Sequence, residues 1–142
     1  MRYFDTSYVV RLYTRDAGWE KVRALAATDS VACCLHGQAE VVAAFHRKFR
    51  DRAINQKELA ELLAEFDKDC KAGAFYWLPL SPAVIERVIK AYSSLAGTFH
   101  LRAADAMHLA CAAESALREI QSNDAQLLAA SSHFGLKGVN VL

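Results

Sequence analysis

Four acidic residues of this chain stand near the starts of expected helices, beside apolar sequence. They are Asp5, Glu40, Asp105 and Asp124. An acid in that position commonly caps the helix or balances the partial positive charge of its first turn, and for each residue taken alone this is the preferred interpretation. Most other acids lie among lysines and arginines or recur at helical spacing, as expected for a solvated surface. These four acids are therefore the ones whose placement could serve chemistry.

Such a set of acids could bind a divalent cation. If the strands that precede these helices are parallel, their carboxyl ends meet at one rim of the sheet and bring several carboxylates together. Clustered carboxylates repel and desolvate one another, and a divalent cation relieves that repulsion. Ligands that are all oxygen favour Mg²⁺ or Mn²⁺ over zinc.

Alternating strands and helices are expected to position the acids. Short apolar or polar runs predict strands at residues 3–4, 30–34, 75–80, 119–122 and 139–142. Helical spacing and capping residues predict helices over residues 8–13, 18–27, 37–52, 55–73, 82–97, 103–116 and 124–134. This alternation predicts an α/β protein whose parallel sheet is covered by helices on both faces.

Length and composition predict one domain, residues 1–142. The chain is 54% hydrophobic and 23% charged, with two prolines and six glycines, so no linker or low-complexity tract is expected. No apolar run reaches the roughly 18 residues of a membrane span, and no secretion signal is evident, so a cytoplasmic protein is expected. With a net charge of +1, any nucleic-acid contact must come from local patches.

The four cysteines show no metal or disulfide pattern. Cys33 and Cys34 are adjacent, while Cys70 and Cys111 stand alone, and no C-x-x-C pair occurs. We expect all four to behave as small buried hydrophobic residues.

Four segments, in order along the chain, carry a resemblance to a known family. They are Tyr3-Phe4-Asp5-Thr6-Ser7, Glu40 heading a helix, residues 101–110 (LRAADAMHLA) and residues 122–130 (SNDAQLLAA). Together they resemble the PIN-domain family, and more narrowly its VapC-type toxins, the ribonuclease halves of bacterial toxin–antitoxin pairs. The resemblance spans the whole chain and implies a three-layer α/β/α fold with a central, mainly parallel five-stranded sheet.

The resemblance also implies a metal-dependent endoribonuclease that hydrolyses RNA phosphodiester bonds by in-line attack of water. It makes Asp5, Glu40, Asp105 and Asp124 the catalytic, metal-binding acids, with Asp5 and Asp105 as anchors for Mg²⁺ or Mn²⁺. Whether Glu40 and Asp124 bind the metal directly, bind it through water or orient the nucleophile is left open.

Other positions match or depart from the family pattern. Thr6 and Ser122 match its supporting hydroxyl positions. Residues 119–121 are more polar than the usual strand, and His36-Gly37-Gln38 stands where a Ser or Thr often precedes the glutamate.

Basic residues follow Glu40 on the same expected helix and admit two interpretations. Arg47, Lys48, Arg50 and Arg52 could bind RNA phosphates, or they could be ordinary cations near a helix C-terminus. His108 follows Asp105 by three residues, and in so apolar a helix a hydrogen-bonded core histidine is favoured over a catalytic base.

Rival functions fit the sequence less well. A phosphoacceptor receiver needs paired acids after its first strand, and a haloacid-type phosphatase needs an acid where Ser7 stands. A metal-free histidine ribonuclease has no organising pattern among the remaining histidines. The strongest alternatives share the fold: a housekeeping PIN-domain RNA-processing nuclease, or a catalytically silent RNA-binding module.

The resemblance further implies two protein partners. A cognate VapB-type antitoxin is expected to lay a helix near Tyr8, Leu12 and Trp19 and to direct a basic residue at the acids. A homodimer is also expected, with the aromatic residues 75–77 and the helix that follows Asn55 as its apolar surface.

Overall fold

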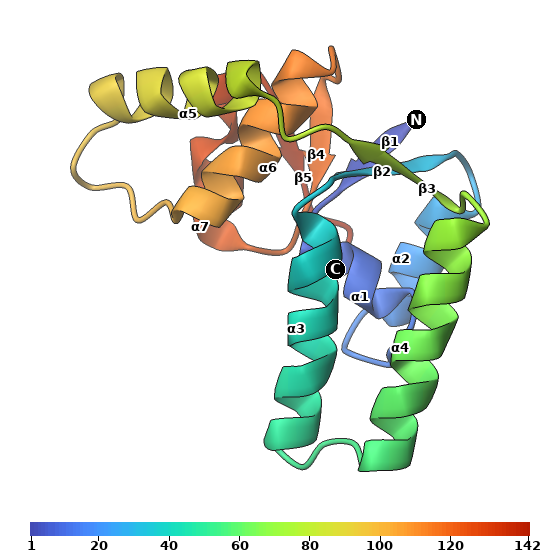
Figure 1. Ribbon diagram of the computed structural model, residues 1–142. Helices are drawn as coiled ribbons and strands as arrows, with labels where there is room; N and C mark the ends of the chain where they lie inside the picture. Colours follow the sequence, from blue (N-terminus) through green and yellow to red (C-terminus); the bar gives the residue numbers. More distant parts are fainter.

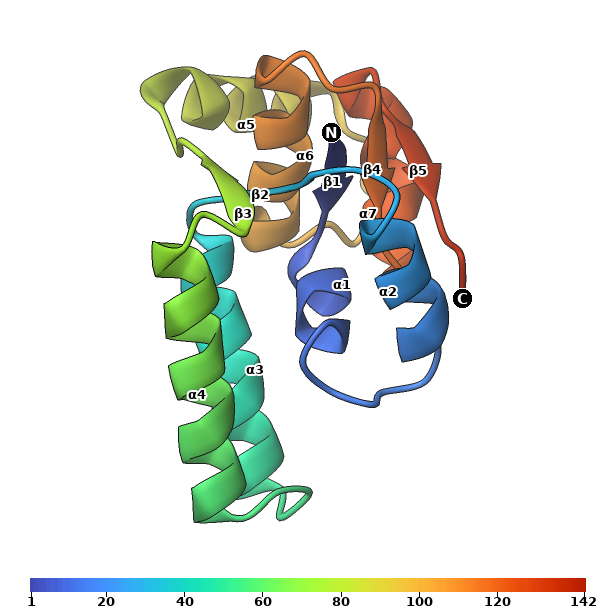
Figure 2. The same cartoon turned by 90° about the vertical axis from the view of Figure 1, so that its right-hand side faces the viewer.

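Five short strands form one sheet in which every neighbouring pair is parallel. In the computed structural model, which describes residues 1–142, the strand order is β3-β2-β1-β4-β5 (Figure 2). The strands are β1 (Arg2–Phe4), β2 (Val31–Cys34), β3 (Phe75–Leu78), β4 (Glu119–Gln121) and β5 (Lys137–Val139). The expected parallel sheet is confirmed, and it is parallel throughout.

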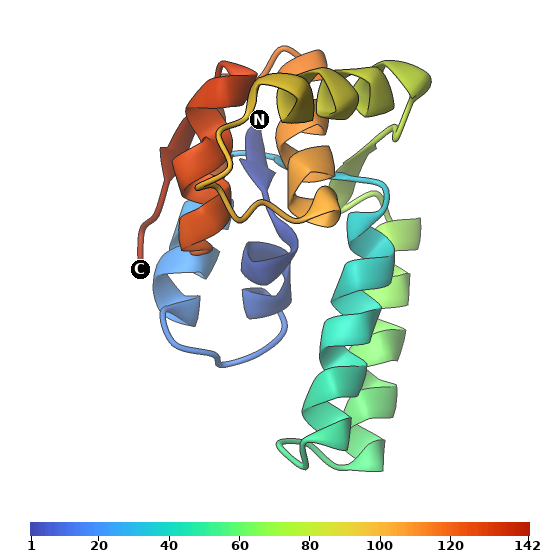
Figure 3. The ribbon, with the colours of Figure 1, turned by 90° about the vertical axis from the view of Figure 1, so that its left-hand side faces the viewer.

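Helices cover both faces of this sheet. They are α1 (Thr6–Arg11), α2 (Trp19–Ala26), α3 (Gly37–Arg50), α4 (Gln56–Lys71), α5 (Pro82–Ser94), α6 (Ala103–Glu114), α7 (Ala125–Ala130) and the 3₁₀ helix Ser131–Phe134. Helices α1 to α4 lie on one side, where α3 and α4 pair as a hairpin that extends away from the sheet (Figure 1). Helices α5, α6 and α7 lie on the other side (Figure 3). The result is the expected three-layer α/β/α architecture.

The alternation of side chains along the strands divides the interior into two cores. Tyr3 and Cys34 point into a core built with α5, α6 and α7. Their neighbours Phe4 and Cys33 point into a second core built with α1 to α4. Strand β2 is therefore buried on both faces along its whole length, which explains its continuous apolar sequence.

Capping residues determine where several helices begin. Asn55 and Glu58 form a reciprocal capping box at α4. The Ser81 hydroxyl accepts from Val84 N at α5, where Pro82 occupies the first turn. Asp5 and Asp124 cap α1 and α7 with their carboxylates. The two acids were thus correctly placed at helix starts from local sequence.

The C-terminal part of the chain corrects two expectations. The last strand covers Lys137–Val139 and not residues 139–142. The chain leaves the sheet after Val139 because Val141 N donates to the Tyr8 hydroxyl and Val141 packs on the second core. The helix expected over 124–134 divides into α7 and a 3₁₀ turn, where the Ser131 hydroxyl donates to the carbonyl of Leu128.

The remaining boundaries lie within a few residues of expectation. The first helix begins at Thr6, directly after its cap Asp5, and the polar segment Glu119–Gln121 is a true strand between β1 and β5. Cys33, Cys34 and Cys111 are buried and Cys70 is half-buried, all as free thiols. None of the helices combines the length and the apolar character that crossing a membrane requires.

Candidate metal-dependent active site

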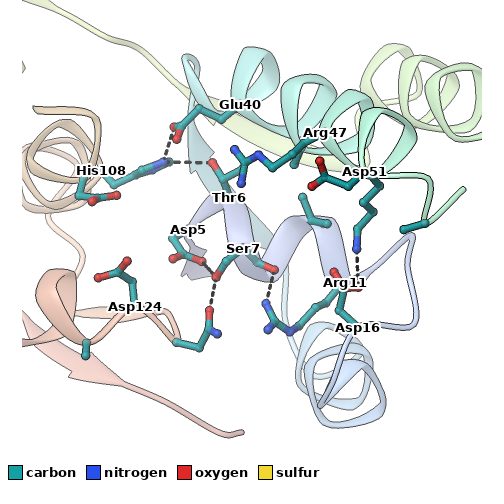
Figure 4. Close-up of a pocket in the computed structure, with 17 residues that line it drawn as sticks. Asp5, Thr6, Ser7, Arg11, Asp16, Glu40, Arg47, Asp51, His108 and Asp124 are labelled. Atoms are coloured by element: carbon teal, nitrogen blue, oxygen red, sulfur yellow. Dashed lines mark hydrogen bonds and ion pairs between the residues drawn. The ribbon is translucent and has the colours of Figure 1, made fainter. Parts of the chain in front are cut away.

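The four predicted acids face one cleft at the carboxyl ends of the central strands, although no three of their carboxylates lie within 4.8 Å of one another. Asp5 follows β1, Glu40 lies in the first turn of α3 after β2, Asp105 lies in the first turn of α6, and Asp124 caps α7 after β4. All four line one cleft of about 700 Å³ (Figure 4). The parallel strand order brings them together because it directs three of the strand ends to one rim.

Asp5 is the most deeply buried of the four, with 5% of its surface exposed. Its Oδ1 accepts hydrogen bonds from Ser7 Oγ at 2.7 Å and from Tyr8 N at 3.0 Å, and its Oδ2 accepts one from Ser122 Oγ at 2.5 Å. Burial raises the pKa of Asp5, although these hydrogen bonds oppose the shift. The carboxylate is therefore fixed in orientation while its negative charge remains poorly solvated.

Asp105 carries a carboxylate to which no donor of the protein is hydrogen bonded. Burial raises its pKa, and the negative charges of Asp124, Glu40 and Asp5 raise it further against the opposing effect of His108. Asp124 is held differently, because its Oδ1 accepts from Gln126 N at 2.8 Å and Leu127 N at 2.9 Å. The least satisfied carboxylate of the cleft is thus Asp105.

Glu40 differs from the aspartates because two imidazoles contact it. His36 Nε2 lies 2.9 Å and His108 Nε2 lies 2.8 Å from the same carboxylate oxygen, Oε1. Burial would raise the pKa of Glu40, but the hydrogen bonds from His108 and His36 outweigh it and lower that pKa. Burial opposes protonation of His36, whereas its contacts with Cys34 and Glu40 raise its pKa to about 9. Glu40 is accordingly ionised at neutral pH.

His108 is buried to 1% exposure and is the hydrogen-bonded core histidine that its apolar helix suggested. Its Nδ1 lies 2.8 Å from the Tyr3 hydroxyl, which in turn accepts from Cys34 N at 3.0 Å. Its Nε2 also lies 3.2 Å from Thr6 Oγ1. Of the two supporting hydroxyls, Ser122 therefore contacts an acid, while Thr6 contacts the histidine.

Gly37 allows α3 to begin directly against the end of β2. A Cβ atom at this position would come within 2.5 Å of Cys33 Sγ and close to Thr6 Oγ1 and His108 Cε1. Any larger residue would push the first turn of α3 outward. Glycine here thus keeps His36 and Glu40 next to α6.

The predicted basic residues separate into two pairs. Arg47 and Lys48 line the cleft, whereas Arg50 and Arg52 do not. Lys48 Nζ is engaged by Asp16 at 2.5 Å, so Arg47 is the better placed of the two to meet a phosphate. Arg11, which the sequence did not single out, also lines the cleft.

Sequence reasoning missed several other residues around the acids. Ser7 Oγ donates to Asp5 and also lies 2.7 Å from Asn123 Oδ1, and His36 contacts Glu40. The signal for His36 was its spacing, because a residue four positions before Glu40 shares its side of a helix. No comparable local signal marks Asn123, which meets Ser7 only through the packing of β4 beside β1.

The residues of the cleft fit a hard divalent cation. Three aspartates and a glutamate supply oxygen donors, as Mg²⁺ and Mn²⁺ prefer. The carboxylate of Asp105 has no hydrogen-bond donor and is repelled by its neighbours. A cation bound there would give the Asp105 carboxylate a positively charged partner and would relieve its repulsion by the neighbouring acids.

Comparison with known proteins supports the assignment of the fold. No curated protein matches the sequence. The structure of FitAcB from Neisseria gonorrhoeae is similar to this chain with a TM-score of 0.76 at 18% identity, over 99% of this chain and 97% of that chain. The PIN domain matches residues 2–131, which include all four acids. Since that match spans most of the chain, this protein belongs to the PIN-domain family.

Proposed function

We propose that this protein is an endoribonuclease that hydrolyses RNA phosphodiester bonds with Mg²⁺ or Mn²⁺ in the acidic cleft. The observation that carries the proposal is the convergence of four carboxylates, from four separate segments, on one cleft in which Asp105 has no hydrogen-bond donor. An arrangement of this kind costs stability unless a cation binds. Membership of the PIN-domain family, whose members are generally nucleases, supports the same conclusion.

Asp5, Asp105 and Asp124 would hold the cation. When bound, it lowers the pKa of the attacking water and neutralises charge on the phosphoryl oxygens. Ser122, Ser7 and Tyr8 N hold the Asp5 carboxylate in one orientation. Glu40 is kept ionised by its two histidines and faces the same cleft, so it is able to orient the nucleophilic water by accepting a hydrogen bond from it.

The rim of the cleft supplies contacts for the RNA backbone. Arg47 and Arg11 line it, and a guanidinium group suits phosphate recognition. Lys48 is paired with Asp16, while Arg50 and Arg52 lie outside the cleft. We therefore assign phosphate binding to Arg47 first.

Cleavage of total RNA by the purified protein, with and without Mg²⁺ or Mn²⁺, tests the proposal. We expect new RNA ends only with metal, and Asp5→Asn or Asp105→Asn should lower the rate by more than about 100-fold, since even outer-shell partners of a metal cost about 10–100-fold. Asp67→Asn, which changes an exposed acid of α4, is the matched control. Full activity of Asp5→Asn in a folded protein would refute the assignment.

We further propose that the protein is the toxin of a toxin–antitoxin pair, of the VapC type, silenced by a VapB-type antitoxin. The four carboxylates offer a target for an arginine or lysine on the antitoxin, which would compete with the metal. Of the apolar residues expected to contact it, Tyr8 is fully buried, while Leu12 and Trp19 are half-exposed. Arg15 and Arg23 lie over the Trp19 ring, so this surface is basic as well as aromatic.

Growth and pull-down assays test this role. Expression of the protein alone should arrest growth, and co-expression with a small neighbouring reading frame should restore it and yield a complex. RNA cleavage in vitro without any effect on growth would favour the housekeeping nuclease instead. Binding of RNA without cleavage would indicate the catalytically silent module.

A further inference from the structure

We propose that His36, Glu40 and His108 form a second metal site, for a transition-metal ion of the Zn²⁺ class, beside the aspartates. One ligand atom from each residue lies within 4.8 Å of the other two, and no other His, Cys, Asp and Glu side chains of the chain make such a group. Binding at this site does not depend on the proposed nuclease activity. It shares Glu40 with the acidic cleft, but it differs from the aspartate part because two imidazole nitrogens supply ligands.

The donor set determines the kind of ion. Two imidazole nitrogens and one carboxylate oxygen are the ligands found in open zinc sites, where water completes the coordination. Imidazole suits zinc, copper, iron and nickel, whereas Mg²⁺ prefers carboxylates and water. The aspartate part of the cleft and the histidine part therefore select different ions.

The present distances are close to those that coordination requires. Glu40 Oε1 lies 2.9 Å from His36 Nε2 and 2.8 Å from His108 Nε2. Ligand atoms about 2.0–2.1 Å from a tetrahedral zinc ion are about 3.3 Å apart, so Glu40 needs to separate from each histidine by about half an ångström. The ligand atoms of the two histidines lie within 4.8 Å of each other. Glu40 has 32% of its side chain exposed, which leaves a path for the ion and for water.

The backbone holds the three ligands in place. His36 and Glu40 stand one helical turn apart at the start of α3, which Gly37 keeps against β2. His108 comes from the buried helix α6. Because rigid elements carry all three residues, the site is largely formed before an ion arrives, and little conformational entropy is lost on binding.

His108 also has the outer contact typical of a metal-binding histidine. Its Nδ1 faces the Tyr3 hydroxyl at 2.8 Å, and Cys34 N fixes that hydroxyl at 3.0 Å. Without a metal, Nε2 donates to Glu40. When an ion takes the place of that proton, Nδ1 carries the ring proton instead, and the Tyr3 hydroxyl can accept it. The Nδ1 atom of His36 is buried without a hydrogen-bond partner, so His36 lacks the outer contact that His108 has.

A titration with Co²⁺, in the presence of excess Mg²⁺ to occupy the aspartates, tests the proposal. Equilibrium dialysis gives the stoichiometry, and visible absorption reports nitrogen ligands in a four- or five-coordinate site. We expect one retained Co²⁺ per chain with intense absorption. His36→Gln and His108→Gln should each weaken its binding by at least about tenfold, as loss of an outer-shell partner already costs about 10–100-fold.

Two further variants separate this site from its surroundings. His46→Gln removes an exposed histidine of the same helix α3 and should leave Co²⁺ affinity unchanged. Asp5→Asn should also leave it unchanged, although that variant loses the proposed nuclease activity. His108→Gln could unfold because it is buried, but the more exposed His36 keeps the test decisive. Loss of all Co²⁺ in excess Mg²⁺, or wild-type affinity in folded His36→Gln, would overturn the proposal.

Discussion

The hydroxyl of Ser122 donates a hydrogen bond of 2.5 Å to Oδ2 of Asp5 and so joins the carboxyl ends of β1 and β4. The Oγ atom of Ser122 also accepts a hydrogen bond from Asp124 N at 2.9 Å. One buried side chain thus orients a metal-binding acid of the first strand and the loop that carries another acid. The relationship depends on the parallel pairing of Phe4 with Gln121, one residue before each partner.

We predict that Ser122→Ala destabilises the protein and weakens its activity. The change leaves a buried carboxylate oxygen and a backbone N–H without a partner, which costs about 1–3 kcal/mol. Urea unfolding should show that loss, and RNA cleavage should need more Mg²⁺ because Asp5 is no longer held. Ser132→Ala, at an exposed serine, is the control and should match the wild type. Unchanged stability of Ser122→Ala would show that the hydrogen bond contributes nothing.

Asp105→Asn should stabilise the metal-free protein, and more so as pH rises. The raised pKa of Asp105 means that its protonated form is favoured in the folded state. Its contribution to stability is therefore full below the unfolded pKa, near 3.8, and is lost as pH rises through the folded pKa. Unfolding measured from about pH 4 to about pH 7 should show a growing advantage for Asp105→Asn.

Divalent metal should reverse the order of stability and make the wild type more stable than Asp105→Asn. Saturating Mg²⁺ binds the folded wild type and raises its free energy of unfolding, whereas Asp105→Asn should gain little. A variant that is less stable than wild type at neutral pH without metal would mean that the carboxylate is not repelled in the cleft. Asp67→Asn again serves as the exposed control.

Arg47→Ala should weaken RNA binding without altering the fold. Its side chain lines the cleft and has no carboxylate within ion-pair distance, so its loss removes one phosphate contact. Filter binding of a catalytically inactive Asp5→Asn background should show lower affinity and a salt slope smaller by about 1. Arg50→Ala, just outside the cleft on the same helix, should change neither quantity, and equal effects of the two would contradict the assignment.

A homodimer remains a prediction, but the structure changes the surface that would form it. Phe75 and Trp77 pack beside Phe66 inside the protein, which leaves only Tyr76 exposed in that cluster, at 55%. Helix α5 presents a larger apolar face that includes Ile85, Ile89 at 65% exposure, and Tyr92. Sedimentation should show a dimer that Ile89→Asp dissociates and Lys90→Ala does not. A 15.7 kDa species alone at micromolar concentration would contradict it.

Local sequence determined the features that depend on neighbouring residues. Asp5 and Asp124 cap helices because their side chains reach backbone N–H groups two or three positions on, whatever the rest of the chain does. Asn55 and Glu58 did the same for α4. The alternation of strands and helices then implied a parallel sheet, and with it the gathering of four acids at one rim. These inferences needed only short-range spacing and the rule for parallel strands.

The tertiary structure alone decided which side chains meet across the layers. Val139–Leu142 reads locally as a strand, yet Val141 packs elsewhere because Tyr8, distant in sequence, supplies its hydrogen bond. The sequence indicated on which face of its helix His108 lies, but not its contacts, which are Tyr3 from β1 and Glu40 from α3. Such contacts depend on how two helices and a strand pack, and packing is a property of the whole core that no local pattern encodes.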